Sequence, residues 1–223
     1  MSETPPPGGT PLGPVDDIPW AALTPDELAR LLGGVDVPWR VSAGWAIDLF
    51  VGRQTREHED LELAVPSAAF PRLRQHLPQF TFVIPGPAGP GQSQCWPADH
   101  EAALAWRHQT WARDGEGSFR FDVFREPHDG QTWICRRDPS IRLPYPRVVR
   151  TTAAGVPYEA PEVVLLFKAK HTRPKDEADL ATVLPLLDDA ARDWLRSALE
   201  LVHPGHPWVE RVTRAPERPA PAG

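Results

Sequence analysis

The feature that most constrains this chain is a six-residue segment in which acidic and apolar side chains alternate. The sequence DLELAV, residues 60–65, has the two-residue period of a strand with one face in a hydrophobic core. Residues two apart on a strand point the same way, so Asp60 and Glu62 present two carboxylates on one face. Like charges this close repel each other unless a cation lies between them, and such oxygen ligands suit Mg²⁺. The segment predicts either a magnesium site or an acidic pair on a solvated sheet face.

A second strand pattern carries one further acid. In FRFDVFRE, residues 119–126, alternation places Asp122 on the same face as Arg120 and Phe124. An acid among aromatic and β-branched neighbours costs free energy unless it has a partner. If the two strands are adjacent, three carboxylates meet, which is enough to hold two Mg²⁺ ions that bridge the phosphates of a nucleotide.

A turn of small residues precedes the first acidic segment. In VSAGWAID, residues 41–48, a strand pattern runs into a helix pattern through Ser42, Ala43 and Gly44. A helix N-terminus offers unpaired N–H groups and the positive end of a dipole, and small residues let a phosphate approach the backbone. The Ser42 hydroxyl could add a donor to such a phosphate, although capping of the helix explains this serine equally well.

Three basic side chains are candidates for contacts with phosphate. Arg56 and His58 lie in the turn before the acidic segment, and Lys168 lies on an apolar-rich helix pattern. For Arg56 the alternative is a solvated loop in which it pairs with Glu57 or Glu59, a weak surface effect. For Lys168 the aliphatic stem can follow the core while the ammonium group reaches a cleft, and the alternative is a solvated helix face.

The order of the remaining patterns predicts an α+β fold, because a strand-rich part precedes a helical part. Before residue 161 we expect helices at 24–33, 43–52 and from Ser67 to about Leu77, and strands at 38–42, 60–65, 80–84, 102–112, 118–126 and 131–137, with a loop over 85–100. After it we expect three helices, in PEVVLLFKAK, PKDEADLATVLPLL and DDAARDWLRSALELV. The domain boundaries that follow are a disordered Pro/Gly-rich stretch at 1–16, a sheet-bearing domain at 17–160, a helical region packed on it at 161–210, and a flexible tail at 211–223.

Composition narrows the classes of function. The formal net charge of −6 over 223 residues argues against a wide nucleic-acid footprint, which needs a basic face. Cys95 and Cys135 form no CxxC pair, so we expect free thiols and no zinc site. The N-terminus lacks the pattern of a signal peptide, and no apolar run reaches the roughly 20 residues of a membrane span, so a cytoplasmic protein without a membrane partner is expected.

Taken in order, the small-residue turn, the acid-x-acid strand and the later single acid resemble the nucleotidyltransferase superfamily typified by DNA polymerase β. More narrowly, SAGWAIDLFVGRQTREHEDLELAV resembles the aminoglycoside nucleotidyltransferase-like proteins of bacteria. The segments FRFDVFRE, RRDPSIRLP, APEVVLLFKAKHTRPKDEADL and HPGHPW extend the likeness over about residues 20–210. The resemblance implies a polymerase β-like nucleotidyltransferase fold, in which helices flank a mixed β-sheet and further helices follow at the C-terminus.

The resemblance also implies roles for particular residues. Catalytic and metal-binding roles fall on Asp60, Glu62 and Asp122, and nucleotide contacts fall on Ser42, Gly44, Arg56, His58 and Lys168. Two positions depart from the family pattern. Ala43 replaces the first glycine of the phosphate turn, which adds a methyl group near the expected phosphate path, and Glu62 replaces the commoner aspartate.

The implied activity is a Mg²⁺-dependent transfer of a nucleoside monophosphate from an NTP such as ATP to a hydroxyl acceptor, with two Mg²⁺ ions and release of pyrophosphate. A small-molecule acceptor, with the polycationic aminoglycoside antibiotics among the candidates, suits a net-acidic protein and implies a role in antibiotic resistance. Three alternatives remain open. They are a non-catalytic nucleotide-binding module, which Ala43 favours, a toxin-type nucleotidyltransferase acting on RNA or protein, and a phosphohydrolase that uses the same acids on water.

Overall fold

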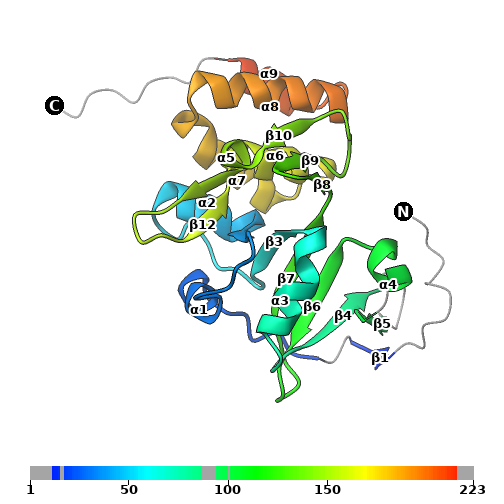
Figure 1. The fold of residues 1–223 in the computed structure, drawn as a ribbon. Coiled ribbons are helices and arrows are strands. Elements are labelled where there is room, and N and C mark those ends of the chain that lie inside the picture. Colours follow the sequence, from blue (N-terminus) through cyan, green and yellow to red (C-terminus); the bar gives the residue numbers. More distant parts are fainter. Residues whose placement is uncertain (1–11, 16–17, 87–93, 100, 215–223) are drawn as a thin grey trace.

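A mixed nine-stranded sheet passes through the molecule, and the C-terminal helices gather at one end of it (Figure 1). The computed structural model describes residues 12–15, 18–86, 94–99 and 101–214. The strand order is β1-β5-β4-β6-β7-β3-β2-β12-β11, and a separate three-stranded sheet has the order β10-β9-β8. The α+β class predicted from the sequence is confirmed.

Four neighbouring strands carry the predicted site, namely β7 (Phe119–Glu126), β3 (Glu62–Pro66), β2 (Arg40–Val41) and β12 (Pro157–Glu159). β3 pairs with β7 in parallel, and Glu62 lies directly opposite Asp122 in the register. Residues opposite each other on neighbouring strands share a face of the sheet. The carboxyl groups of Glu62 and Asp122 therefore lie on the same side, as the alternation in the two segments predicts.

The other strands extend the sheet away from the site or form the small sheet. The large sheet also contains β1 (Gly13–Pro14), β4 (Thr81–Pro85), β5 (Gln94–Pro97), β6 (Gln109–Arg113) and β11 (Val149–Thr151). The small sheet contains β8 (His128–Asp129), β9 (Thr132–Ile134) and β10 (Arg142–Pro144).

Local sequence signals explain where the first two helices begin and end. α1 (Pro25–Leu31) starts with a complete capping box, in which the Thr24 hydroxyl accepts from the Glu27 N–H and the Glu27 carboxylate accepts from the Thr24 N–H. α2 (Ala43–Val51) follows β2 directly and ends at Gly52, whose φ of 80° is the left-handed conformation that glycine adopts without strain. Both helices were predicted within two residues of these bounds.

The remaining helices lie mostly in the second half of the chain. They are α3 (Phe70–His76), α4 (Glu101–Trp106), α5 (Tyr145–Val148), α6 (Pro161–Lys168), α7 (Pro174–Val183), α8 (Asp189–Val202) and α9 (Trp208–Thr213). A proline opens α6 and α7, which suits the first turn because the N–H groups there have no helical partner. The Asp188 carboxylate accepts from the Ala191 N–H and caps α8.

Several predicted elements are wrong in detail. The range 102–112 is a helix followed by a strand, because EAALAW combines helix-forming residues at α4 before β6 begins. The range 85–100 contains β5, with residues 87–93 and 100 outside the described part. Ser67 does not cap a helix, since residues 67–69 form a 3₁₀ turn before α3. The range 131–137 holds only the short strand β9.

The chain ends also differ from the predicted boundaries. β1 and α9 extend into the stretches 1–16 and 211–223, for which we expect disorder and flexibility. β1 pairs with β5, so this piece of the N-terminal stretch is part of the large sheet. The rest of the two predicted segments, residues 1–11, 16 and 215–223, lies outside the described residues.

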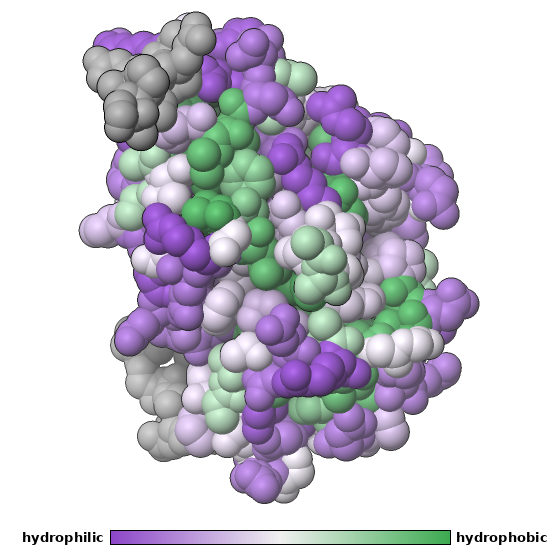
Figure 2. All heavy atoms as spheres, turned by 90° about the vertical axis from the view of Figure 1, so that its left-hand side faces the viewer, coloured by the Kyte–Doolittle hydropathy of each residue, from purple (hydrophilic) through white to green (hydrophobic). Residues whose placement is uncertain are grey.

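One hydrophobic core joins the sheet to the C-terminal helices. The core runs without interruption from Leu61 and Leu63 on the sheet side to Leu166 of α6 and Trp208 of α9. Both cysteines are free and buried. The face on the side of α1 and α2 mixes hydrophilic and apolar residues (Figure 2). Within the described ranges, every helix is too short or too polar to span a bilayer.

Candidate active site

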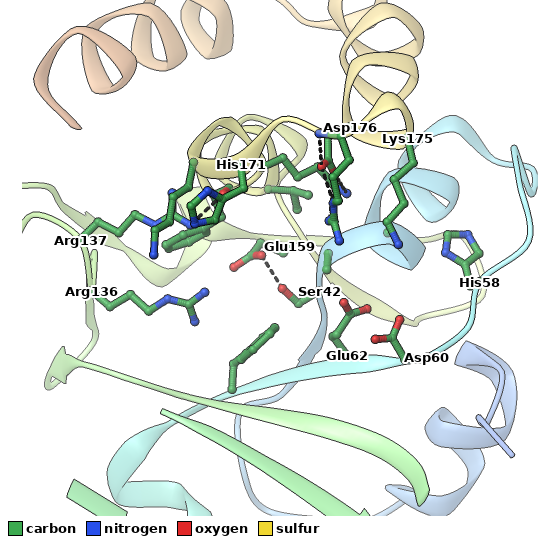
Figure 3. A pocket seen from close by; sticks show the side chains of 18 of the residues that line it. Ser42, His58, Asp60, Glu62, Arg136, Arg137, Glu159, His171, Lys175 and Asp176 are labelled. Carbon is green, nitrogen blue, oxygen red and sulfur yellow. Dashed lines mark hydrogen bonds and ion pairs between the residues drawn. The ribbon is translucent and has the colours of Figure 1, made fainter. Parts of the chain in front are cut away.

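A cleft of about 320 Å³ opens between the sheet, the N-terminus of α2 and the start of α7 (Figure 3). Seven of the eight predicted site residues line it, namely Ser42, Gly44, Arg56, His58, Asp60, Glu62 and Lys168. Asp122 lies beneath the cleft surface with 2 % of its surface exposed. The structure therefore brings the predicted set together from four separate segments of the chain.

Asp60 and Glu62 point into this cleft from the start of β3 (Figure 3). Asp60 precedes the strand, which begins at Glu62, but the residue between them, Leu61, is fully buried in the core. The predicted separation of carboxylates from apolar residues is thus confirmed. Burial raises the pKa of Glu62 to about 8, and the nearby charges of Asp60 and Asp122 add to this rise.

Asp122 completes the acidic group from the neighbouring strand. Burial raises its pKa to about 7 and the charge of Asp60 adds to the rise, while a hydrogen bond from Gln109 opposes it. The Gln109 amide N–H donates to Oδ2 of Asp122, and Oδ1 is buried without a hydrogen-bond partner. An unpartnered buried carboxylate oxygen is costly and indicates that a further group belongs beside it.

The donor set fits a hard divalent cation, although the side chains are not arranged as a complete metal centre. Within the described part of the chain, no group of three or more His, Cys, Asp or Glu side chains has the geometry to hold a metal ion. The fit rests on the oxygen ligands of Asp60 and Glu62 and on the unpartnered Oδ1 of Asp122. It also rests on the repulsion among these carboxylates, which adds to the rise in the pKa values of Glu62 and Asp122. Magnesium binding therefore stays a prediction.

The phosphate turn leaves the N-terminus of α2 open to the cleft. Ser42 stands at the N-cap, but its side chain makes no capping bond and its hydroxyl donates to Glu159 Oε2 at 2.5 Å. The capping interpretation of Ser42 is thus wrong, and its hydroxyl is already engaged. A Cβ atom added at Gly44 would lie 2.5 Å from the Arg56 guanidinium and 2.7 Å from His58 Nδ1. Glycine is required at this position by its side-chain neighbours as well as by any phosphate.

A buried charge network lies behind the turn. Arg40 is 1 % exposed and pairs with Glu126 at the end of β7 and with Glu159 of β12, at 3.2 Å for the latter. Trp133 Nε1 also donates to Glu126. Since Ser42 bonds to Glu159, this network fixes the turn to β7 and β12. The sequence analysis does not identify it, because its members lie far apart in the chain and have no shared motif.

Arg56 and His58 form a second network that holds the turn before β3. His58 Nε2 lies 2.5 Å from Asp48 Oδ2, and the His58 ring stacks on Trp45 at 4.3 Å. Arg56 contacts His58 Nδ1 at 3.1 Å and pairs with Asp179 of α7 at 3.4 Å. Arg56 also donates to the Glu57 carbonyl at 3.1 Å, but its ion-pair partner is Asp179 and not the carboxylate of Glu57 or Glu59. Its charge and the His58 ring line the cleft while they connect α2 to α7.

Lys168 forms ion pairs with two acidic side chains. Its Nζ lies 3.0 Å from Asp176 Oδ1 and 2.8 Å from Asp179 Oδ2, and its side chain is 8 % exposed. Both acids belong to α7. Lys168 lines the cleft as expected, but two carboxylates neutralise it, so it is neither a solvated surface lysine nor a free phosphate ligand.

Further basic residues of the cleft were not singled out from the sequence. They are Arg136, Arg137, Lys170, His171, Arg173 and Lys175. Arg136 and Arg137 enter from the loop after β9, opposite the acids in the close-up view (Figure 3). The sequence feature that could have indicated Arg136 and Arg137 is the Arg-Arg pair at the start of RRDPSIRLP, directly after a short strand pattern.

Comparison with protein families gives a match over the segment that carries Asp60 and Glu62. Residues 26–91, which include the phosphate turn, Asp60 and Glu62, match the family model of aminoglycoside-2″-adenylyltransferases. Over this segment the chain is aminoglycoside nucleotidyltransferase-like. The match covers the predicted metal ligands of β3 but ends before Asp122, so the role of the third acid depends on the structure alone. A comparison with curated protein sequences gives no match.

Solved structures with a similar arrangement include two antibiotic adenylyltransferases. The lincosamide antibiotic adenylyltransferase LnuA, lincomycin-bound, is 15 % identical and covers 70 % of this chain and 91 % of its own, with a TM-score of 0.48. ANT(2″)-Ia in complex with adenylyl-2″-tobramycin is 16 % identical and covers 79 % and 94 %, with a TM-score of 0.49. A nucleotidyltransferase-like protein of Paracoccidioides brasiliensis is 16 % identical and covers 83 % and 88 %, with a TM-score of 0.41.

Proposed function

We propose that the protein is a Mg²⁺-dependent nucleotidyltransferase that moves a nucleoside monophosphate from an NTP to the hydroxyl group of a small-molecule acceptor. The observation that carries the proposal is the placement of Glu62 opposite Asp122 on paired parallel strands, with Asp60 close enough to raise both pKa values. This acidic group lies beside the open N-terminus of α2, where a triphosphate can bind. The family match makes antibiotics, and aminoglycosides first, the acceptors to test.

In the proposed reaction the acceptor oxygen attacks the α-phosphorus of the NTP. The bond from the α-phosphorus to the bridging oxygen of the β-phosphate breaks, and pyrophosphate leaves with the electron pair. Asp122 takes the proton of the acceptor hydroxyl, and the backbone N–H groups at Ala43 and Gly44 hold phosphate oxygens. Mg²⁺ held by Asp60 and Glu62 would supply neutralisation of the phosphate charge. Phosphoryl transfer of this kind depends mainly on position and charge.

The test is an incubation of the full chain with Mg²⁺ and each of four α-³²P-labelled nucleotides, ATP, GTP, CTP and UTP, with and without a panel of aminoglycosides and lincomycin. We expect label on an acceptor, and a loss of about a thousandfold or more in rate for Asp60→Asn and for Glu62→Gln, since each removes a charge that balances the metal. Glu57→Gln is the matched control, because this exposed acid lies in the same loop and outside the cleft lining.

Each other outcome contradicts part of the proposal. Bound nucleotide without transfer indicates a nucleotide-binding module. Label on added RNA or protein indicates a toxin-type transferase. Free nucleoside monophosphate without an adduct indicates a hydrolase. Equal rates for Asp60→Asn, Glu62→Gln and Glu57→Gln would show that Asp60 and Glu62 take no part in the reaction.

A further inference from the structure

A second cavity of about 200 Å³ adjoins the cleft on the side of β6 and β7. Its lining consists of Arg107, His108, Gln109, Phe124, Arg136, Arg137 and Lys170. Four of these side chains are cations, and no carboxylate of the described residues lines the cavity. Its charge is therefore opposite in sign to the net charge of −6 of the whole chain. We call it the basic side cavity.

Within the described part of the chain, the cations of the basic side cavity form no ion pair, although the charge of Arg136 acts on the buried Asp122. Arg136 lies between two aromatic rings, with its guanidinium carbon 4.8 Å from the centre of Phe124 and 4.4 Å from that of Phe167. Throughout the described residues, neither Arg136 nor Lys170 has a carboxylate partner. This distinguishes the pair from Arg56 and Lys168, which are paired with acids on α7. An aromatic sandwich fixes the plane of a guanidinium while its N–H edge stays available to a ligand.

Arg137 and Arg107 add two further hydrogen-bond donors, and neither guanidinium forms an ion pair with a described carboxylate. Arg137 donates to the Phe167 carbonyl at 2.8 Å and contacts His203 at 3.1 Å, so it is held in place without a counter-charge. Burial and the neighbouring charge of Arg136 lower the pKa of Arg137 to about 10. Nε of Arg107 is buried and has no hydrogen-bond partner. Repulsion between neighbouring cations is relieved most directly by a bound anion.

The basic side cavity is connected to the predicted catalytic acid. Gln109 lines the cavity and donates its amide N–H to Asp122, and Phe124 lies two residues along β7 on the same face as Asp122. A hydroxyl group must come within about 3 Å of the base that takes its proton. An acceptor that reaches Asp122 past Gln109 therefore places the rest of its body in the basic side cavity.

We infer that the acceptor of this enzyme is a small hydroxyl compound that carries an anionic group of the size and charge of a phosphate, bound by Arg107, Arg136, Arg137 and Lys170. The inference rests on the proposed function for the identity of the reaction, and it replaces a cationic acceptor with an anionic one. A polycationic aminoglycoside would bring its charges against four cations that form no ion pair with the described side chains, and like charges placed together disfavour binding.

The first test measures the cavity without any transfer reaction. The full chain is loaded with Mg²⁺ and a non-hydrolysable ATP analogue, so that the nucleotide subsite is filled, and inorganic phosphate is titrated in a calorimeter. We expect binding that weakens about tenfold in Arg107→Gln and in Arg136→Gln, because each removes a charged hydrogen bond to the anion. Arg72→Gln is the matched control, since this exposed arginine pairs with Asp36 and lies outside both cavities.

Arg107 makes the test specific, because it lines the basic side cavity and not the cleft. Two results would overturn the inference. One is phosphate binding that the ATP analogue abolishes, which assigns the arginines to the triphosphate. The other is the absence of phosphate binding, or binding that is unchanged in both variants. Circular dichroism spectra of each variant establish that a lost signal is not lost folding.

The second test uses acceptors that differ only in the anion. Transfer of labelled nucleotide is compared between glucose and glucose 6-phosphate, glycerol and glycerol 3-phosphate, and a panel of aminoglycosides. The inference predicts at least a tenfold higher kcat/KM for the phosphorylated member of a pair, and loss of this preference in Arg107→Gln. Efficient transfer to an aminoglycoside contradicts the inference while it supports the proposed function. Phosphate binding with no transfer to any acceptor contradicts the proposed function alone.

Discussion

Ala43 is the one non-glycine residue with a positive φ in the described part of the chain. Its φ is 50°, in the left-handed region where a Cβ atom is strained, and it occupies the position at which the resembling family has a glycine. The residue therefore departs from the family pattern by its methyl group, in a backbone conformation that glycine adopts without strain. Strain of this kind concentrates at functional sites, where the surrounding structure holds it in place.

Replacing Ala43 by glycine should relieve this strain. The left-handed conformation costs a residue with a Cβ about 1–2 kcal/mol, and the greater freedom of glycine in the unfolded chain offsets part of the gain. We expect Ala43→Gly to raise the free energy of unfolding in urea by about 0.5 kcal/mol and to tighten binding of an ATP analogue. Ala178→Gly, at an exposed position inside α7, should instead lower the free energy of unfolding by about 1 kcal/mol. A destabilised Ala43→Gly would show that the turn is not strained.

At the scale of elements, the contact between α6 and α7 depends on one lysine. Lys168 at the end of α6 meets Asp176 and Asp179 of α7, and both acids are almost fully buried. Burying such charges is tolerated only while they remain paired. The two helices are therefore held in position by a charged triad beside the candidate active site.

Removal of the lysine should leave two buried carboxylates that keep only Arg173 and Arg56 as partners. We expect Lys168→Met to lower the free energy of unfolding by about 3 kcal/mol, measured by urea denaturation at pH 7. Lys175→Met is the comparison, because Lys175 is nearer the surface and lies 3.9 Å from the exposed Glu59. This variant should lose about 0.5 kcal/mol or less. Equal losses in the two variants would contradict a structural role for Lys168.

The same triad predicts a pH dependence of stability. Burial alone would raise the pKa of Asp176, but hydrogen bonds from Arg173 and Lys168 outweigh it and hold the pKa at about 2, below the ordinary value of 3.8. A depressed pKa stabilises the fold above the unfolded value, so this contribution is complete above pH 4 and is lost as the pH falls towards 2. It is on the order of 2 kcal/mol.

We expect Asp176→Asn to be less stable than the wild type at pH 7 and to differ less from it near pH 2.5, in urea unfolding followed by circular dichroism. A difference between the two proteins that stays constant across this range would show that Asp176 does not titrate with a lowered pKa.

At the scale of the whole molecule, one core connects the sheet and the C-terminal helices. Trp133 lies in the small sheet and Trp208 in α9, and both are fully buried in this core. Because this core spans both parts of the chain, it predicts cooperative unfolding, with a small second cluster around Val83 and Phe119 beside it. Tryptophan fluorescence and far-ultraviolet circular dichroism should give coincident urea transitions, whereas two separated transitions would indicate independent units.

The sign of the charge around the candidate site differs from the sign of the net charge of the whole molecule. The net charge of −6 suits a cationic acceptor, yet the described side chains that line the cavity next to Asp122 include four cations and no carboxylate. A ligand responds to the groups within a few ångströms of it, because salt screens charges beyond about 8–10 Å. The overall composition therefore says little about the acceptor of this site.

Local sequence determined the pieces of this protein whose physical cause is also local. The alternation at Asp60–Val65 needs only the strand period, the start of α1 needs only Thr24 and Glu27, and the end of α2 needs only Gly52. The acidic half of the candidate site could therefore be predicted from a few neighbouring residues. EAALAW shows the limit of such arguments, because a short segment among predicted strands forms α4.

Tertiary structure decided which partners these residues have. Ser42 bonds to Glu159, and Arg56 and Lys168 are paired with acids of α7. The cations of the basic side cavity come together from the segments that follow α4, β9 and α6. Each of these contacts joins residues that periodicity and spacing do not relate. Periodicity determines the face on which a side chain lies. The groups that the side chain contacts depend on how the whole chain packs. Those contacts in turn set the charge state and the role of the side chain.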